Sequence, residues 1–146
     1  MSETLLVALV QMDVHRSDKT ANRNHIIGKL RECAEMGAKL VIFPECALSG
    51  YVFNSAEEAL PATETVPGET SQLLAEICKE LNIYAVVGLL EHDGEAVYNS
   101  AFVVGPEGLV GNYRKSHLPI LGIDRYVEHG NDLPIFDLPF ARIGVL

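Results

Sequence analysis

The chain has 146 residues, enough for one domain with a sizeable core, and its hydrophobic (48%) and charged (21%) fractions exclude a disordered polypeptide. Its formal net charge of −9 argues against electrostatic attraction to nucleic acid or to an anionic membrane. We therefore expect neither a nucleic-acid partner nor a membrane partner.

The sequence also bears on the compartment in which the protein works. No apolar stretch approaches the roughly 18 residues of a membrane span, and residues 1–10 lack the basic region of a signal peptide. The cysteines Cys33, Cys46 and Cys78 are odd in number and have no metal-ligand spacing, which favours reduced thiols. These features predict a cytoplasmic protein.

The N-terminal part of the chain has the pattern of a βαβ unit. A continuous apolar run at residues 5–10 predicts a strand covered on both faces. Asp18 or Thr20 can cap a following helix, Gly37 is placed to end it, and residues 40–43 predict the next strand. The apolar stripe of this helix consists of Ile26, Ile27, Leu30, Cys33 and Ala34.

The rest of the chain predicts one more helix and a series of hairpins. Residues 46–67 are expected to form irregular surface, and a helix opens at Pro67-Gly68-Glu69-Thr70. Its apolar face is predicted to contain Leu73, Leu74, Ile77 and Leu81. Further strands are predicted at 83–90, 97–104, 109–113, 135–138 and 142–146, with a hairpin turn at Asp93-Gly94 and a loop over 116–132. This order predicts a single α/β domain over residues 1–146 with a mixed sheet and helices on one face.

Two side chains of opposite charge follow predicted strands. Glu45 comes directly after Phe43-Pro44, and Lys115 follows the strand at 109–113. Ligand sites in α/β folds gather beyond the carboxyl ends of strands, where a carboxylate and an ammonium can serve acid–base catalysis and oxyanion stabilisation. Each residue taken alone is more often a surface charge, but Pro44 and the apolar residues after Glu45 favour a partly desolvated carboxylate.

A second acid is expected near the lysine. Either Asp124 or Glu128 can orient Lys115, and the alternative is a loop carboxylate paired with Arg125. His117 can act as an acid or base, but a packed, hydrogen-bonded structural histidine is the favoured interpretation. The sequence contains no cluster with metal-site spacing, so we expect no metal, and its glycines form no phosphate-binding loop.

An ordered series of motifs spans nearly the whole chain. The series consists of Val10-Gln11-Met12, residues 37–45 ending in Phe43-Pro44-Glu45, Gly50-Tyr51, Val66-Pro67-Gly68, Tyr98-Asn99-Ser100-Ala101 and residues 111–118. With this series the chain resembles the carbon–nitrogen hydrolase family, also called the nitrilase superfamily. The resemblance implies the N-terminal part of a four-layer αββα sandwich, whose second sheet comes from the later half of the chain, and a homodimer or larger homo-oligomer.

The resemblance also implies roles for individual residues. Glu45 matches the catalytic general base of the family and Lys115 matches its catalytic lysine. A further family glutamate aligns with Asp124, which is one methylene shorter, so Glu128 remains an alternative. Tyr51 is a candidate substrate-binding residue, with simple packing as the other interpretation. The implied activity is hydrolysis of a non-peptide C–N bond, in an amide or N-carbamoyl substrate, by a Cys-Glu-Lys mechanism without a cofactor.

The cysteine nucleophile of the family follows a strand like residues 142–146, and the sequence ends before it. Cys46 adjoins Glu45 but would point away from it in an extended backbone. Cys33 and Cys78 lie on helix stripes, where packing is the better explanation. We therefore expect a domain incomplete at its C-terminal side, which is a first piece or a truncated form of a longer polypeptide rather than a degenerate half.

Two functional alternatives remain open at this point. A half-domain can serve as a non-catalytic interaction module, and a true nitrilase is the less favoured enzyme. Substrate specificity is expected to depend on the loops at 46–66 and 116–132, whose sequences do not point to one substrate.

Overall fold

The computed structural model describes residues 4–146; residues 1–3, part of the segment analysed for a signal peptide, lie outside this range. The helices are α1 (Lys19–Glu35), α2 (Ala56–Ala59) and α3 (Glu69–Leu81), with short 3-10 turns at Leu60–Ala62 and Gly122–Arg125. The strands are β1 (Val7–Leu9), β2 (Leu40–Ile42), β3 (Tyr84–Asp93), β4 (Ala96–Gly105), β5 (Gly108–Arg114), β6 (Ile135–Leu138) and β7 (Ala141–Gly144). Within this part of the chain no helix is both long and apolar enough to cross a membrane.

A five-stranded mixed sheet in the order β1-β2-β3-β4-β5 forms the centre of the molecule. The first three strands are parallel and are connected by α1 and α3, whereas β3, β4 and β5 are antiparallel hairpin neighbours. Asp18 caps α1 by accepting a hydrogen bond from the backbone of Ala21 (2.9 Å), and Gly37 follows its end with a positive φ of 87°. The predicted α/β fold with a mixed sheet is confirmed.

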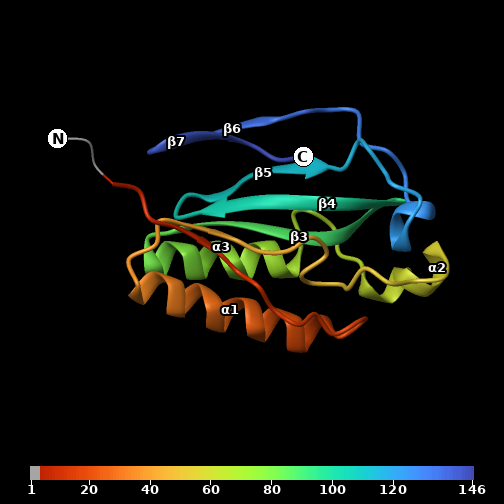
Figure 1. Cartoon of the computed structure of the whole chain (residues 1–146), viewed down its shortest axis with the longest axis horizontal. Coiled ribbons are helices and arrows are strands. Elements are labelled where there is room, and N and C mark those ends of the chain that lie inside the picture. The colour runs from red at the N-terminus through yellow and green to blue at the C-terminus, as the bar shows by residue number, and fades with distance from the viewer. Residues whose placement is uncertain (1–3) are drawn as a thin grey trace.

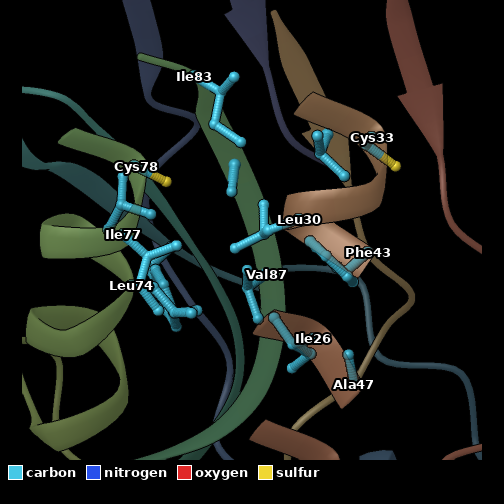
Figure 2. Close-up of a cluster of buried hydrophobic side chains, with 14 of the residues drawn as sticks. Ile26, Leu30, Cys33, Phe43, Ala47, Leu74, Ile77, Cys78, Ile83 and Val87 are labelled. Carbon is cyan, nitrogen blue, oxygen red and sulfur yellow. The ribbon is translucent and has the colours of Figure 1, made fainter. Parts of the chain in front are cut away.

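The sheet is covered on both faces (Figure 1). On one face α1 and α3 pack their apolar side chains against β3, as Figure 2 shows for Ile26, Leu30, Leu74, Ile77 and Val87. On the other face lies the β6–β7 hairpin, which the sequence periodicity alone did not place there. Its buried side chains Phe136 and Leu138 pack against Leu40, Tyr84, Val86, Val103 and Tyr113 of the sheet.

One strand and one helix side chain that were predicted to be buried are exposed. The prediction that the first strand is covered on both faces is wrong, since Leu9 is 76% exposed. The reason is that β1 is the edge strand of the sheet and that, among the described residues, the core cluster of the β6–β7 hairpin extends to Leu40 of β2 but not to β1. Leu73 is also exposed, because the buried face of α3 follows Leu74, Ile77 and Cys78 instead.

Residues 46–67 differ from the expected irregular surface. Residues 46–50 are buried, and the segment continues into α2 and a 3-10 turn. Its apolar residues form a third core cluster at the end of the sheet, which contains Cys46, Phe53, Ala59, Ala62, Leu90 and Ile123. This cluster packs the 46–67 loop and the 116–132 loop against the same strand ends.

A close backbone contact fixes the start of that loop. Gly88 of β3 lies against the residues that follow β2, and its carbonyl oxygen accepts a hydrogen bond from the backbone of Leu48 (3.1 Å). A Cβ atom at Gly88 would lie 2.5 Å from the carbonyl oxygen of Pro44 and 2.7 Å from the nitrogen of Cys46. The loop after β2 can approach β3 this closely only because residue 88 has no side chain.

A buried ion pair joins the far ends of β3 and β5. The carboxylate of Glu91 is 1% exposed and accepts hydrogen bonds from Ser100 (2.6 Å), Asn112 (2.7 Å) and Arg114 (3.1 Å from Nε). The guanidinium of Arg114 also lies over the ring of Tyr98, 4.1 Å from its centroid. These contacts satisfy the buried charge and hold the last residue of β5 in place.

The Gly88 contact predicts a large effect from one methyl group. We expect Gly88→Ala to lower the free energy of unfolding of the protein by about 1–3 kcal/mol, because backbone atoms must move to admit the Cβ. Gly28→Ala is the matched control: Gly28 lies inside α1 and a Cβ there meets nothing within 4 Å. Alanine at position 28 should stabilise the protein by about 0.5–1 kcal/mol. Equal effects of the two substitutions in chemical denaturation would contradict the close contact.

The Glu91 ion pair predicts a second stability difference. Arg114→Met should destabilise the protein by about 3 kcal/mol, because it leaves the buried Glu91 carboxylate without its cation. Arg142→Met removes the partner of Asp137 from a pair whose side chains are 70% and 73% exposed, so it should have little effect. Thermal and urea unfolding of both variants would measure the difference, and similar midpoints would show that Glu91 does not need Arg114.

Candidate active site

Glu45 is presented by the turn that follows β2. The strand pairing with β3 continues to Phe43, whose backbone N–H donates to the carbonyl of Val86 (2.9 Å), and the chain turns at Pro44. The Glu45 side chain is 48% exposed, so its carboxylate is partly desolvated, as expected, and about half of its surface stays in contact with solvent. The reason is its position past the end of the strand, at the mouth of a cavity rather than within the core.

Lys115 follows the last residue of β5 and reaches back to this turn. Its Nζ lies 2.6 Å from Oε1 of Glu45, a residue 70 positions away in the sequence, and 2.8 Å from Oδ2 of Asp124. The Lys115 backbone is held from both sides, since its N–H donates to the carbonyl of Asn99 (2.8 Å) and its carbonyl accepts from Gly130 (3.0 Å). The structure therefore brings together the three residues predicted to be catalytic.

Asp124 is the candidate second acid that reaches the lysine. It lies in the 3-10 turn Gly122–Arg125, and its side chain is fully buried. Glu128 is exposed and contributes a backbone N–H to the carbonyl of Val97 (2.8 Å). Arg125 lies over the ring of the next residue along the chain rather than pairing with Asp124. Of the two carboxylates that the sequence left open, only Asp124 contacts Lys115 among the described residues.

Asn99 is a site residue that the sequence analysis did not single out. It lies on β4, is 3% exposed, and its Nδ2 donates to Oε1 of Glu45 (2.7 Å) and to Oδ1 of Asp124 (2.7 Å). A signal for it was present in the sequence, because Asn99 and Ser100 interrupt the apolar pattern of the strand within the motif Tyr98-Asn99-Ser100-Ala101. A buried amide in a strand needs hydrogen-bond partners, and here both partners are carboxylates.

Tyr51 contacts the buried acid. Its hydroxyl lies 3.2 Å from Oδ2 of Asp124 and 2.9 Å from the carbonyl oxygen of Leu121. Burial of the ring and the negative charges of Asp124 and Glu45 raise the pKa of Tyr51 to about 12, so the hydroxyl stays protonated and can donate. Its role in substrate binding stays a prediction, because its contacts are with the second acid.

The ammonium of Lys115 is held in its charged form. Burial alone would lower the pKa of Lys115, but hydrogen bonds to Asp124 and Glu45 and their negative charges outweigh it, and the pKa is raised. An ammonium has three N–H donors, of which two point to these carboxylates. The third remains for a group in the cavity.

His117 and the cysteines were weighed as alternatives. His117 is exposed, so the prediction of a packed histidine is wrong. Its Nδ1 does lie within hydrogen-bond distance (3.2 Å) of the hydroxyl of Ser116. Cys33 and Cys78 are buried in the helix–sheet core, as expected. Burial raises the pKa of both thiols, that of Cys78 to about 12.

Cys46 directly follows Glu45 in the turn after β2. Its backbone is not extended, as the sequence analysis assumed, but left-handed with φ of 50°. Its Sγ lies 3.5 Å from Oδ1 of Asn99, and its side chain is fully buried. Burial first, and the charge of Glu45 second, raise the pKa of the Cys46 thiol. A buried thiol with a raised pKa is a poor nucleophile.

A cavity of about 300 Å³ opens beside these residues. Its polar lining comes from Glu45, Asn99, Ser100 and Lys115, and its apolar walls include Ile42, Val86, Tyr113, Val145 and Leu146. Among residues 4–146, no group of three or more His, Cys, Asp or Glu side chains is arranged to hold a metal ion. The chemistry available in the cavity is therefore that of a carboxylate and a charged amine beside an apolar wall.

The chain is similar in sequence to curated proteins named nitrilase and omega-amidase. The chain is 36% identical over 143 residues to a nitrilase from Pyrococcus abyssi (96% of this chain, 54% of the relative). It is 34% identical over 149 residues to omega-amidase NIT2 from Homo sapiens (95% of this chain, 52% of the relative). The chain thus spans about half the length of the curated relatives it matches.

Solved structures agree on the fold. A CN-hydrolase superfamily protein from Xanthomonas campestris superimposes with a TM-score of 0.80 over 94% of this chain and 51% of that protein, at 24% identity. This likeness supports the nitrilase-like sandwich fold. The family profile described as Carbon-nitrogen hydrolase matches residues 6–146. With that match over nearly its whole length, the chain belongs to the carbon–nitrogen hydrolase family.

Proposed function

We propose that the protein is an amidase-type hydrolase that cleaves a non-peptide C–N bond in an amide or N-carbamoyl substrate. The observation that carries this proposal is the contact of the Lys115 ammonium with the Glu45 carboxylate (2.6 Å) at a cavity with an apolar wall. The omega-amidase relatives support an amide substrate. The relative named nitrilase makes a nitrile the second candidate substrate.

The nucleophile belongs to the same proposal. We place it on a cysteine in polypeptide that follows Leu146 in the intact gene product. Leu146 lines the same cavity as Glu45 and Lys115, which supports a nucleophile supplied from just beyond it. The buried, protonated thiols of Cys33, Cys46 and Cys78 support a nucleophile from outside residues 4–146.

The reaction then runs in two halves. Glu45 takes the thiol proton as the sulfur bonds to the substrate carbon, and the ammonium of Lys115 stabilises the oxyanion of the tetrahedral intermediate. Glu45 passes the proton to the nitrogen as the C–N bond breaks, which releases the amine or ammonia and leaves a thioester. Glu45 next takes a proton from water, whose oxygen attacks the thioester carbon. As the C–S bond breaks, Glu45 returns this proton to the sulfur, which releases the acid product and regenerates the thiol and the Glu45 carboxylate.

This mechanism predicts that both charged residues are required for turnover. Glu45→Gln and Lys115→Ala should each lower kcat/KM by at least about 10²-fold, because each removes a group that acts in the transition state. The assay is ammonia release by the intact gene product from a panel of amides, N-carbamoyl compounds and nitriles. If a cellular effect of the protein survives both substitutions unchanged, the non-catalytic interaction module replaces the hydrolase. An intact mass near 15.9 kDa would also favour that module.

The two acidic residues near the lysine should behave differently. Asp124→Asn keeps the size of the side chain but leaves the ammonium of Lys115 with one carboxylate, so kcat should fall by about 10-fold or more. Glu128→Gln should leave kcat and KM within a factor of two of the parent, because its side chain is exposed and does not reach Lys115. The reverse order of the two effects would assign the second acid to Glu128.

A further inference from the structure

We propose that Asn99 is a positioning residue that holds the Glu45 and Asp124 carboxylates on the Lys115 ammonium and assigns Oε2 of Glu45 as the oxygen that carries the proton. This inference rests on the proposed function, because it divides the work of Glu45 between its two oxygens. The strand pattern marks Asn99 as a polar interruption, but its role follows only from the contacts of its side chain.

The side-chain amide of Asn99 is shared between two carboxylates. Its two N–H bonds are directed at different carboxylates, Oε1 of Glu45 and Oδ1 of Asp124, each at 2.7 Å. The ammonium of Lys115 bonds to the same two groups, at Oε1 of Glu45 and Oδ2 of Asp124. Amide and ammonium thus bridge the same pair of carboxylates; without the amide, the Glu45 carboxylate is held by the ammonium alone and can rotate about that one bond.

The two carboxylate oxygens of Glu45 differ in their hydrogen-bond partners. Oε1 accepts from both Lys115 and Asn99, whereas no donor in residues 4–146 reaches Oε2. An oxygen already engaged by an ammonium and an amide is a weaker proton acceptor than a free one. Proton transfer to and from the thiol, the amine and the water is therefore assigned to Oε2, and Oε1 serves to fix the orientation of the carboxylate.

Asn99 itself is held rigidly by its backbone and its side chain. Its Cα pairs with that of Leu90 in the β3–β4 ladder, and its carbonyl accepts the backbone N–H of Lys115. The Oδ1 atom faces the thiol of Cys46 at 3.5 Å, which leaves both N–H donors for the carboxylates. A 3% exposed residue held at backbone and side chain can position two flexible acids within the tolerance that a proton transfer requires.

The amide is also suited to this place by its charge. Glu45, Asp124 and Lys115 together carry one positive and two negative charges. A neutral amide offers two donors without adding charge, and it cannot lose a proton at any working pH. A carboxyl group of the same shape would add a third negative charge, or would need a proton to provide one donor.

The test compares two isosteric substitutions in the intact gene product. Asn99→Leu removes both donors and should lower kcat by about 10²-fold with little change in KM, because orientation and not binding is lost. Asn99→Asp should be worse at neutral pH, but its kcat relative to Asn99→Leu should increase as pH falls and the introduced carboxyl becomes a donor. The groups facing that carboxyl are Glu45, Asp124, Lys115 and the Cys46 thiol.

Thr70→Val is the matched structural control. Thr70 lies on α3, is fully buried and does not line the cavity, and its hydroxyl donates to Glu64 (2.9 Å), so kcat should remain at the parent value. A crystal structure of the Asn99→Leu protein gives a readout that does not depend on turnover. In it, the Glu45 carboxylate should have rotated off Lys115; an unchanged contact overturns the inference.

The outcomes separate this inference from the proposed function. If Glu45→Gln abolishes ammonia release but Asn99→Leu keeps kcat within twofold of the parent, the inference fails and the hydrolase stands. If the Glu45→Gln protein retains full activity, the proposed mechanism fails, and the crystal structure of the Asn99→Leu protein still decides whether Asn99 holds the carboxylates. A ratio of Asn99→Asp to Asn99→Leu kcat that does not change with pH contradicts the donor role.

Discussion

The carboxylate of Asp124 has no exposed surface, and its burial is compensated above all by the Lys115 ammonium, which lies 2.8 Å away, together with hydrogen bonds from Asn99 and Tyr51. The same ammonium, together with the Asn99 amide, then fixes Glu45, whose side chain is half exposed. The geometry of the site thus follows from the requirement to neutralise one buried acid. The two surrounding loops are arranged to satisfy it: residues 46–67 bring Tyr51, and residues 116–132 bring Asp124 itself.

The mixed sheet makes this convergence possible. The parallel pairing of β2 with β3 brings Glu45 to one end of the sheet, and the antiparallel pairing of β4 with β5 brings Asn99 and Lys115 to the same end. Gly88 on the shared strand β3 lets the Glu45 turn approach closely enough for these bonds. The neighbouring Arg114–Glu91 pair then fixes the strand end from which Lys115 extends.

Much of this arrangement was predictable from the sequence, and the exceptions have physical causes. Alternating and continuous apolar runs indicated the βαβ unit and the hairpins, and Glu45 and Lys115 were placed correctly at strand ends. The exposure of β1 was not predictable, because an apolar run does not show whether a strand lies at the edge of a sheet. The role of Asn99 was missed because its partners come from a turn and a loop distant in the sequence.

The chemistry of the three cysteines has a practical consequence for labelling. Cys33, Cys46 and Cys78 are buried and their raised pKa values keep them as thiols at neutral pH, where alkylating reagents attack the thiolate. Iodoacetamide added in small excess to the undenatured gene product will therefore leave these positions largely unmodified. Peptide mapping of the alkylated protein would then detect a more reactive cysteine elsewhere in the polypeptide without interference from these three positions.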